Sequence, residues 1–346
     1  MLYSILIGIS NDSKMEQGIN KAYMICFTLA CVLVMGLRNI NVGVDTWNYS
    51  HIFNSVVKHA TERDIEYGGI PILVVEIGYA YFMKTCALIC NNYFFFQLVY
   101  SIVFCGLMGN FIYKNSNDII LSTIVFLGLG LYLAAFNIQR QCLAIAILAN
   151  MWQYLKVNKI IIPIILVAIS SLIHTTSLLG LLIIAAYYLS KNKCMTWIMV
   201  SLMVLGIAFF DIFIELFFDS ELANARYSNY LDNHKTVQTA GGAMVVWGII
   251  TLSSIWLILK DKDHNYKFIA LMSLLFIFFN VVGLKFNYLE RIGLITSPYV
   301  LLLFPIVIQK IQNYKLRFYT KIATGICFLI WFSISLGGQY EYDSFI

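Results

Sequence analysis

Charged residues are scarce in this chain of 346 residues. Only 12% of the residues are charged and 60% are hydrophobic, whereas a soluble domain carries about 25% charged residues. Apolar runs of membrane length recur to the end of the chain, which predicts an all-α polytopic membrane protein. The same composition leaves no room for a separate soluble domain.

The motifs of nucleotide and metal chemistry are also missing from the sequence. It contains no Walker loop, no G-x-G-x-x-G after a strand, no G-x-S-x-G and no H-E-x-x-H. ATP-driven transport is therefore not supported. The five histidines lack metal-ligand spacing, and the eight cysteines form neither a disulfide framework nor a C-x-x-C site. The formal charge of +5 is spread over short loops, so we expect no nucleic-acid partner and no cofactor.

Eleven apolar segments are predicted to cross the membrane, within a range of ten to twelve. The segment 77–92 carries Lys84 in its middle and mixes apolar with polar residues, so an interfacial or re-entrant helix is expected there. Residues 1–346 then form a single integral membrane domain, with outer-face loops at about 38–92 and 218–242. The predicted spans are 22–37, 93–113, 119–136, 141–155, 160–173, 175–189, 195–217, 243–259, 267–284, 292–309 and 319–336.

Basic residues sort by type between the two sides of this arrangement. Fourteen of the 23 basic residues fall on one side, which the positive-inside rule makes cytoplasmic. Lysines divide thirteen inside and four outside, whereas arginines divide one inside and five outside. Topology needs only charge, but arginine adds a planar fork that grips phosphate through two bonds. The outer arginines therefore indicate an anionic ligand, unless they are loop residues with carboxylate partners. They are Arg38, Arg63, Arg140, Arg226 and Arg291.

Two acidic residues and one histidine on the outer face are candidates for proton transfer. Asp45 lies at the lip of the first span, seven residues after Arg38, where desolvation raises the pKa of an acid. Glu76, which opens the interfacial segment, shares this reasoning more weakly, and either acid could instead pair with an arginine. His174 lies between two short apolar segments. It is either a proton acceptor or hydrogen-bond donor to substrate, or a residue that caps a helix.

Other polar residues on this face suit anions or sugars. Arg140 lies between two apolar segments, where it either faces a polar cavity or snorkels to the interface. Glu290 and Arg291 form either a neutralised pair or an oriented arginine clamp. Asp261-Lys262-Asp263 matches the D-x-D of nucleotide-sugar transferases, but it occupies a short lysine-rich inner loop and is interpreted as solvated charge.

Taken in chain order, these residues resemble the EpsG-like family of polysaccharide repeat-unit polymerases, which are close in role to the Wzy O-antigen polymerases. The resemblance covers about 250 residues, and no single piece of it is specific. It rests on Arg38, Gly43-x-Asp45-Thr46-x-x-Tyr49, Glu76-x-Gly78-Tyr79, Arg140-Gln141-x-Leu143-Ala144, His174-x-x-Ser177, Arg226-Tyr227-x-x-Tyr230 and Arg291-Ile292.

The resemblance implies a C-type glycosyltransferase scaffold in the inner membrane. Its substrates would be undecaprenyl-pyrophosphate-linked oligosaccharide repeats, joined on the outer face into O-antigen of lipopolysaccharide or into exopolysaccharide. Lipid pyrophosphate would be the leaving group, membrane lipids would surround the enzyme, and a chain-length regulator protein is a further suggested partner.

Roles for individual residues follow from the same resemblance. Arg38, Arg140 and Arg291 are the expected pyrophosphate ligands, and fixed guanidinium groups could replace a metal, so we expect none. Asp45 or His174 is the expected base. The expected glycan contacts are Tyr49, Glu76, Gln141, Arg226, Tyr227 and Tyr230.

Three other functional classes stay open for this protein. A lipid-linked oligosaccharide flippase would explain charge within the membrane, but it predicts cationic residues deep in the spans and internal repeats, which the sequence does not display. A glycan ligase belongs to the same chemical class, and a large outer loop with a single set of His and Arg would favour it. A membrane O-acyltransferase would also use a histidine, but with another set of motifs.

Overall fold

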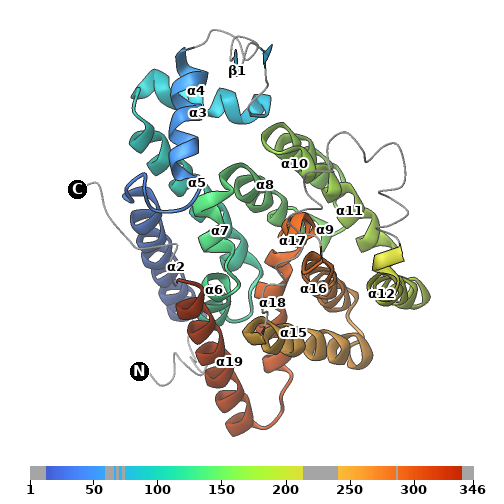
Figure 1. The fold of residues 1–346 in the computed structure, drawn as a ribbon. Helices are drawn as coiled ribbons and strands as arrows, with labels where there is room; N and C mark the ends of the chain where they lie inside the picture. The colour runs from blue at the N-terminus through green and yellow to red at the C-terminus, as the bar shows by residue number, and fades with distance from the viewer. Residues whose placement is uncertain are drawn as a thin grey trace. The chain divides into compact units, whose positions relative to one another are not determined.

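The computed structural model describes residues 13–58, 66–67, 70–71, 75–212, 241–285 and 287–336. These residues form helices throughout (Figure 1), apart from one pair of two-residue antiparallel strands. Strands β1 (Glu66–Tyr67) and β2 (Ile70–Pro71) pair Glu66 with Pro71. The helical architecture confirms the all-α class and fits a polytopic membrane protein.

Five of the described helices are long and apolar enough to cross a membrane. A sixth span arises if α6 (Ile119–Gly128) and α7 (Leu131–Asn137) count as one, bent by 46°. The left-handed Gly130, with φ 77°, lies at this bend, in a conformation that glycine adopts without steric cost. The five are α2 (Ser13–Gly36), α5 (Tyr93–Asn115), α15 (Gly241–Lys260), α16 (His264–Gly283) and α19 (Tyr314–Ser335).

The other predicted spans coincide with shorter helices. A helix of 13 residues, such as α10 (Ile161–Ile173), is only about 20 Å long, against a hydrocarbon core of about 30 Å. The count of eleven spans therefore stays a prediction. The expected interfacial segment forms α4 (Ile77–Ile89). The remaining elements are α3 (Thr46–Lys58), α8 (Gln139–Ala149), α9 (Trp152–Leu155), η2 (Thr175–Leu179), α11 (Gly180–Leu189), α12 (Lys193–Ala208), α17 (Asn287–Gly293) and α18 (Ser297–Gln309).

The chain divides into two compact units. Unit 1 comprises Met1–Leu182 and Ile308–Ile346, and unit 2 comprises Ile183–Val307. Both contain apolar helices of membrane length. The single integral membrane domain over residues 1–346 stays a prediction.

Unit 1 is built on the pairing of α2 with α5, which run side by side (Figure 1). Small residues allow this close approach, because a Cβ on Gly109 would lie 2.7 Å from Oγ1 of Thr28. The inner faces bury Phe96, Tyr100 and Phe104 completely. On the outer face of α2, Leu29 and Leu33 are more than half exposed, as suits side chains that meet lipid.

The two ends of α5 carry different chemistry. Near its start, Nε2 of Gln97 donates to the carbonyls of Gly36 (3.1 Å) and Arg38 (2.8 Å). At its last turn, Oδ1 of Asn115 accepts from Nζ of Lys156 (2.9 Å). Since 23 helical residues span about 35 Å, these two ends lie on opposite sides of unit 1. The predicted outer-face loops and the predicted inner lysines thus separate along α5.

Unit 2 is built around α16, which packs against α12, α15 and α17. Its side chains from Phe268 to Leu274 are buried without a break, because helices surround it. By contrast, α12 exposes Leu202 and Val204, and α15 exposes Leu252 and Leu259. These outer apolar faces are available to lipid.

Candidate functional site

The loop between α2 and α3 is held by a buried arginine. The side chain of Arg38 has no exposed surface, and its Nη1 donates to the Met35 carbonyl at 2.6 Å. Its Nη2 donates to the Phe136 carbonyl at 3.2 Å, and the guanidinium carbon lies 4.4 Å from the centre of the Phe136 ring. Burial lowers the pKa of Arg38 despite the nearby tyrosines. Arg38 therefore ties this loop to the end of α7, just before the break that leads into α8.

Glycine completes the junction between the loop and the α7–α8 break. Gly43 adopts a left-handed φ of 92°, and a Cβ there would lie 2.8 Å from Oδ1 of Asn137. The hydroxyl of Thr46, at the start of α3, also donates to the Phe136 carbonyl at 3.3 Å. These contacts bring two predicted outer-face segments together at one end of unit 1.

A single carboxylate joins three helix ends at this place. Glu76 is the N-cap residue of α4, Arg140 lies in the first turn of α8, and His174 separates α10 from η2. Oε2 of Glu76 accepts from Nη1 of Arg140 at 2.5 Å. Oε1 lies 2.8 Å from Nδ1 of His174 and accepts from the backbone N–H of Thr175 at 3.3 Å. We call Glu76, Arg140 and His174 the bridged cluster.

Close packing of α4 on α10 sets the distance within the bridged cluster. A Cβ on Gly78 would lie 2.7 Å from the carbonyl oxygen of Leu172 and 2.8 Å from its Cβ. Only glycine allows this approach, since real Cβ atoms are not found so close to backbone atoms. Gly78 lies two residues after Glu76, and Leu172 lies two residues before His174. The helix contact thus positions the carboxylate against the imidazole.

Glu76 is ionised in the bridged cluster. Burial opposes its charge, but the hydrogen bond from His174 and the charge of Arg140 outweigh burial and lower its pKa to about 2. This reverses the expectation that desolvation raises the pKa of an acid at this face, so Glu76 is a poor base. An ionised carboxylate only accepts hydrogen bonds, so Nδ1 of His174 must carry the proton it donates. In the neutral imidazole, Nε2 is then the atom able to take a proton.

The bridged cluster is partly open to its surroundings. The side chains of Glu76, His174 and Arg140 are 15%, 20% and 28% exposed. Nε of Arg140 is buried and has no hydrogen-bond partner in the part of the chain that the structure describes. The exposed parts of the three side chains are where a ligand would contact the cluster.

Tyrosines form the floor of the bridged cluster. Burial raises the pKa of Tyr49, and the adjacent Arg140, which shares a hydrogen bond with its hydroxyl, opposes that rise. The ring of Tyr49 lies 6.2 Å from that of Tyr79. The Tyr79 hydroxyl donates to Oε1 of Gln139 at 2.9 Å, and Nε2 of Gln139 donates to the Tyr93 hydroxyl at 3.4 Å.

Comparison with known proteins identifies a family for this chain. The model of the EpsG family matches residues 21–344, nearly the whole chain. The chain belongs to the EpsG family. This family is one of Wzy-like polymerases, so the resemblance seen in the sequence is confirmed. No curated protein and no solved structure matches the chain.

The structure brings together some of the site residues predicted from the resemblance to the EpsG family, and it separates others. Glu76, Arg140, His174 and Tyr49 meet, as described above. Asp45 is half-buried beside Tyr49, and its Oδ1 lies 3.5 Å from Nδ2 of Asn48, but it makes no described hydrogen bond to the bridged cluster. Arg38 lies inside the protein, with backbone carbonyls as its acceptors.

The other expected ligands of this EpsG-family protein lie elsewhere. Gln141 is buried in α8. Arg291 is exposed on α17, in unit 2. Arg226, Tyr227 and Tyr230 lie outside the described residues. Sequence reasoning also missed Gln139 and Tyr79 as site residues, although both stand beside residues that it selected.

The described residues of this EpsG-family chain contain no group of three His, Cys, Asp or Glu side chains that could hold a metal ion. The expectation of metal-independent chemistry stays a prediction.

Proposed function

We propose that this EpsG-family protein is a metal-independent glycosyltransferase that polymerises lipid-linked oligosaccharide repeats, and that the bridged cluster is its catalytic site. The observation that carries the proposal is the carboxylate of Glu76, which holds a histidine with one oxygen and an arginine with the other. A base and a cation fixed side by side suit a reaction that removes a proton while negative charge grows on a leaving group.

His174 is the proposed general base. The acceptor hydroxyl gives its proton to Nε2 of His174, and its oxygen forms a bond to the anomeric carbon of the donor glycan. The bond from that carbon to the pyrophosphate oxygen breaks, and its electron pair stays on undecaprenyl pyrophosphate. Glu76 touches neither reactant and acts as a positioning residue, because its hydrogen bond fixes the tautomer and the orientation of the imidazole.

Arg140 is the proposed ligand of the leaving group. Its charge is balanced by Glu76 in the resting site, so the cluster is close to neutral while His174 is neutral. Proton transfer turns His174 into a cation and gives the cluster a net positive charge as the pyrophosphate becomes more negative. The charge change in the protein then matches the charge change in the substrate, which lowers the energy of the transition state.

Surroundings and partners belong to the same proposal. The enzyme would lie in the bacterial inner membrane, with the bridged cluster on the periplasmic or exterior face. Its membrane lipid substrate would approach sideways, and a chain-length regulator protein would act with it. Arg291 is kept as a predicted pyrophosphate ligand, and Arg226, Tyr227 and Tyr230 are kept as predicted glycan contacts. Asp45 is kept as the second candidate for the base.

A strain that lacks the gene tests this proposal through its surface-glycan ladder. The expected result is glycan capped at a single repeat, with the ladder restored by the wild-type gene and by Asp45→Asn but not by His174→Gln. Protein levels in the membrane serve as the control. Restoration by His174→Gln and failure by Asp45→Asn would make Asp45 the base. Complete loss of surface glycan in the deletion strain would point to a flippase, and loss of transfer to the final lipid with normal polymer would point to a ligase.

A further inference from the structure

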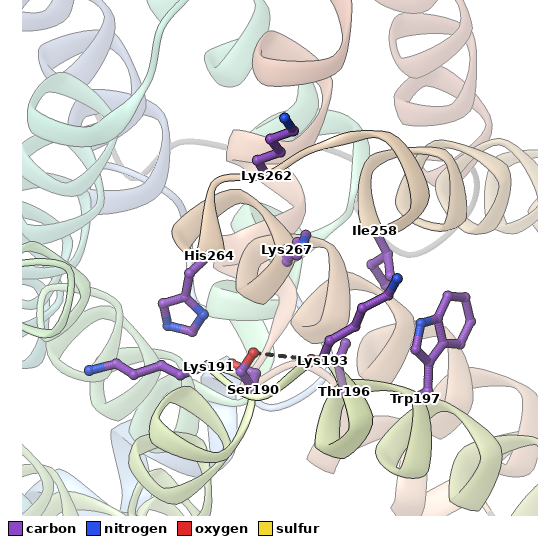
Figure 2. Close-up of a pocket in the computed structure, with 9 residues that line it drawn as sticks. All are labelled: Ser190, Lys191, Lys193, Thr196, Trp197, Ile258, Lys262, His264 and Lys267. Carbon is purple, nitrogen blue, oxygen red and sulfur yellow. Dashed lines mark hydrogen bonds between the residues drawn. The ribbon is translucent and has the colours of Figure 1, made fainter.

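A basic hollow lies within unit 2, between the turn that joins α11 to α12 and the turn that joins α15 to α16. It is a small hollow of about 70 Å³ that is partly open to solvent. Figure 2 shows the His264 ring on the α15–α16 side, directed toward the turn that carries Ser190 and Lys191. Four lysines and one histidine line this space: Lys191, Lys193, Lys262, Lys267 and His264.

Positive charge exceeds negative charge around the hollow. Two aspartates lie in the α15–α16 turn. Oδ1 of Asp261 accepts from the backbone N–H of Asp263, and Oδ1 of Asp263 accepts from that of Asn265, each at 2.8 Å. Against four lysines, these carboxylates leave an excess of two positive charges. Nζ of Lys191 lies 4.5 Å from the centre of the Tyr188 ring, so the direct contacts to a ligand fall to the other three lysines.

His264 adds unused hydrogen-bonding capacity. Both of its ring nitrogens are buried, and neither reaches a partner at hydrogen-bonding geometry within the described residues. The Ser190 carbonyl lies near the ring, but outside hydrogen-bonding geometry. A buried donor without a partner costs free energy, which an anionic acceptor in the hollow would recover.

The hollow also adjoins apolar surface. Lys193 is the first residue of α12 and Lys260 is the last residue of α15, so the hollow lies where two apolar helices end. Further along these helices, Leu202 and Leu252 are exposed, and Trp197 and Ile258 form part of the lining itself. A ligand with an anionic headgroup and an apolar tail fits a basic hollow next to apolar helix faces, because basic pockets at helix ends bind anionic headgroups.

We propose that this basic hollow binds a phosphate group through Lys193, Lys262, Lys267 and His264. The phosphate belongs either to the headgroup of an anionic membrane lipid or to a small soluble phosphate. The proposal does not rest on the function assigned to the bridged cluster. It assigns ligand binding to the Asp261-Lys262-Asp263 turn, which the sequence analysis interprets as solvated charge.

The test uses the full-length protein purified in detergent. Native mass spectrometry measures retained phosphatidylglycerol, with zwitterionic phosphatidylcholine as the comparison, and thermal unfolding measures any gain in Tm from inorganic phosphate over chloride. The variant is Lys193→Gln/Lys262→Gln/Lys267→Gln. The matched control is Lys114→Gln/Lys159→Gln/Lys315→Gln, which removes the same charge from exposed lysines outside the hollow. Because Lys262 is exposed in its turn, the single change Lys262→Gln is measured as well, in case the triple variant fails to fold.

The expected result is a loss of phosphatidylglycerol retention of about tenfold or more in the triple variant, with a smaller loss for Lys262→Gln and none in the control. Lysine-dependent stabilisation by inorganic phosphate, with equal lipid retention in all variants, would assign the site to a soluble phosphate instead. Equal retention of both lipids by every variant, together with no effect of phosphate, would overturn the proposal.

Discussion

The bridged cluster of unit 1 and the basic hollow of unit 2 hold positive charge in opposite ways. In the bridged cluster, Arg140 forms an ion pair with the carboxylate of Glu76, and the hydrogen bond from its Nη1 to Oε2 of Glu76 fixes its position. In the hollow, the lysines extend from two turns, and the aspartates nearby bond to their own loop. A fixed planar cation can select the geometry of one reacting group, whereas several mobile point charges attract any anion of suitable size. The first arrangement suits chemistry and the second suits binding.

The largest expected effect is that of Arg140→Lys in the bridged cluster. Lysine keeps the charge but loses the fork that reaches Glu76 and a phosphate together, so the rate of chain extension should fall about 100-fold or more. The measurement is polymerisation of a lipid-linked repeat by the purified enzyme. Arg317→Lys is the matched control, because Arg317 donates to the Ile311 carbonyl far from this cluster in the chain. A near-normal rate for Arg140→Lys would remove the contrast between the two regions.

The next effect is that of Glu76→Gln, which keeps the shape of the side chain and removes its charge. Turnover should fall about 10- to 100-fold with little change in KM, because a misoriented histidine affects the chemical step more than substrate binding. A change in KM alone would assign Glu76 to glycan binding instead.

Acid stability gives the same variant a second readout. The pKa of Glu76 is lowered from 4.5 in the unfolded chain to about 2 in the folded protein. Its stabilising contribution is therefore complete above pH 4.5 and disappears as the pH falls towards 2. The difference in Tm between wild type and Glu76→Gln should shrink over that window. A difference that stays constant down to the lower limit would show that the carboxylate is not held ionised by the cluster.

A smaller effect is expected from Gly78→Ala, which changes no charge. The added methyl group would push α4 away from Leu172 and lengthen the distance from Glu76 to His174, so the rate should fall about tenfold. Gly106→Ala on α5 is the control, since nothing lies within 4 Å of a Cβ there. Equal rates for the two variants would show that the helix contact does not set the geometry of the site.

The smallest effect is that of Lys262→Arg in the basic hollow. Mobile point charges should tolerate this exchange, so retention of phosphatidylglycerol should stay within about twofold of wild type. Lys262→Gln in the same assay should reduce retention. A strong loss with arginine would mean that the hollow, like the bridged cluster, depends on a fixed geometry.

Hydropathy predicted much of the fold, and residue chemistry predicted part of the site. Long apolar runs are a local signal that can be read from the sequence without knowledge of tertiary contacts. The sequence therefore predicts the helices α2, α5, α15, α16 and α19. Glu76, Arg140 and His174 were each selected from the sequence, but their pairing spans 64 and 98 residues, and no local pattern encodes such a distance. Arg38 was selected as a phosphate ligand because its charge is visible in the sequence, whereas the carbonyls that bury it are not. The D-x-D turn was set aside for a similar reason, because the hollow depends on a second turn some 70 residues earlier.

The burial of Arg38 bears on how the protein is made. Its guanidinium depends on the carbonyl of Phe136, which is 98 residues later in the chain. While the chain emerges from the ribosome and its first helices enter the bilayer, Arg38 has no access to that acceptor. The loop between α2 and α3 can then reach its final form only after α7 has been inserted. Assembly of this end of the molecule is therefore a late step in biogenesis, and a chain truncated before Phe136 would leave Nη2 of Arg38 without its backbone acceptor.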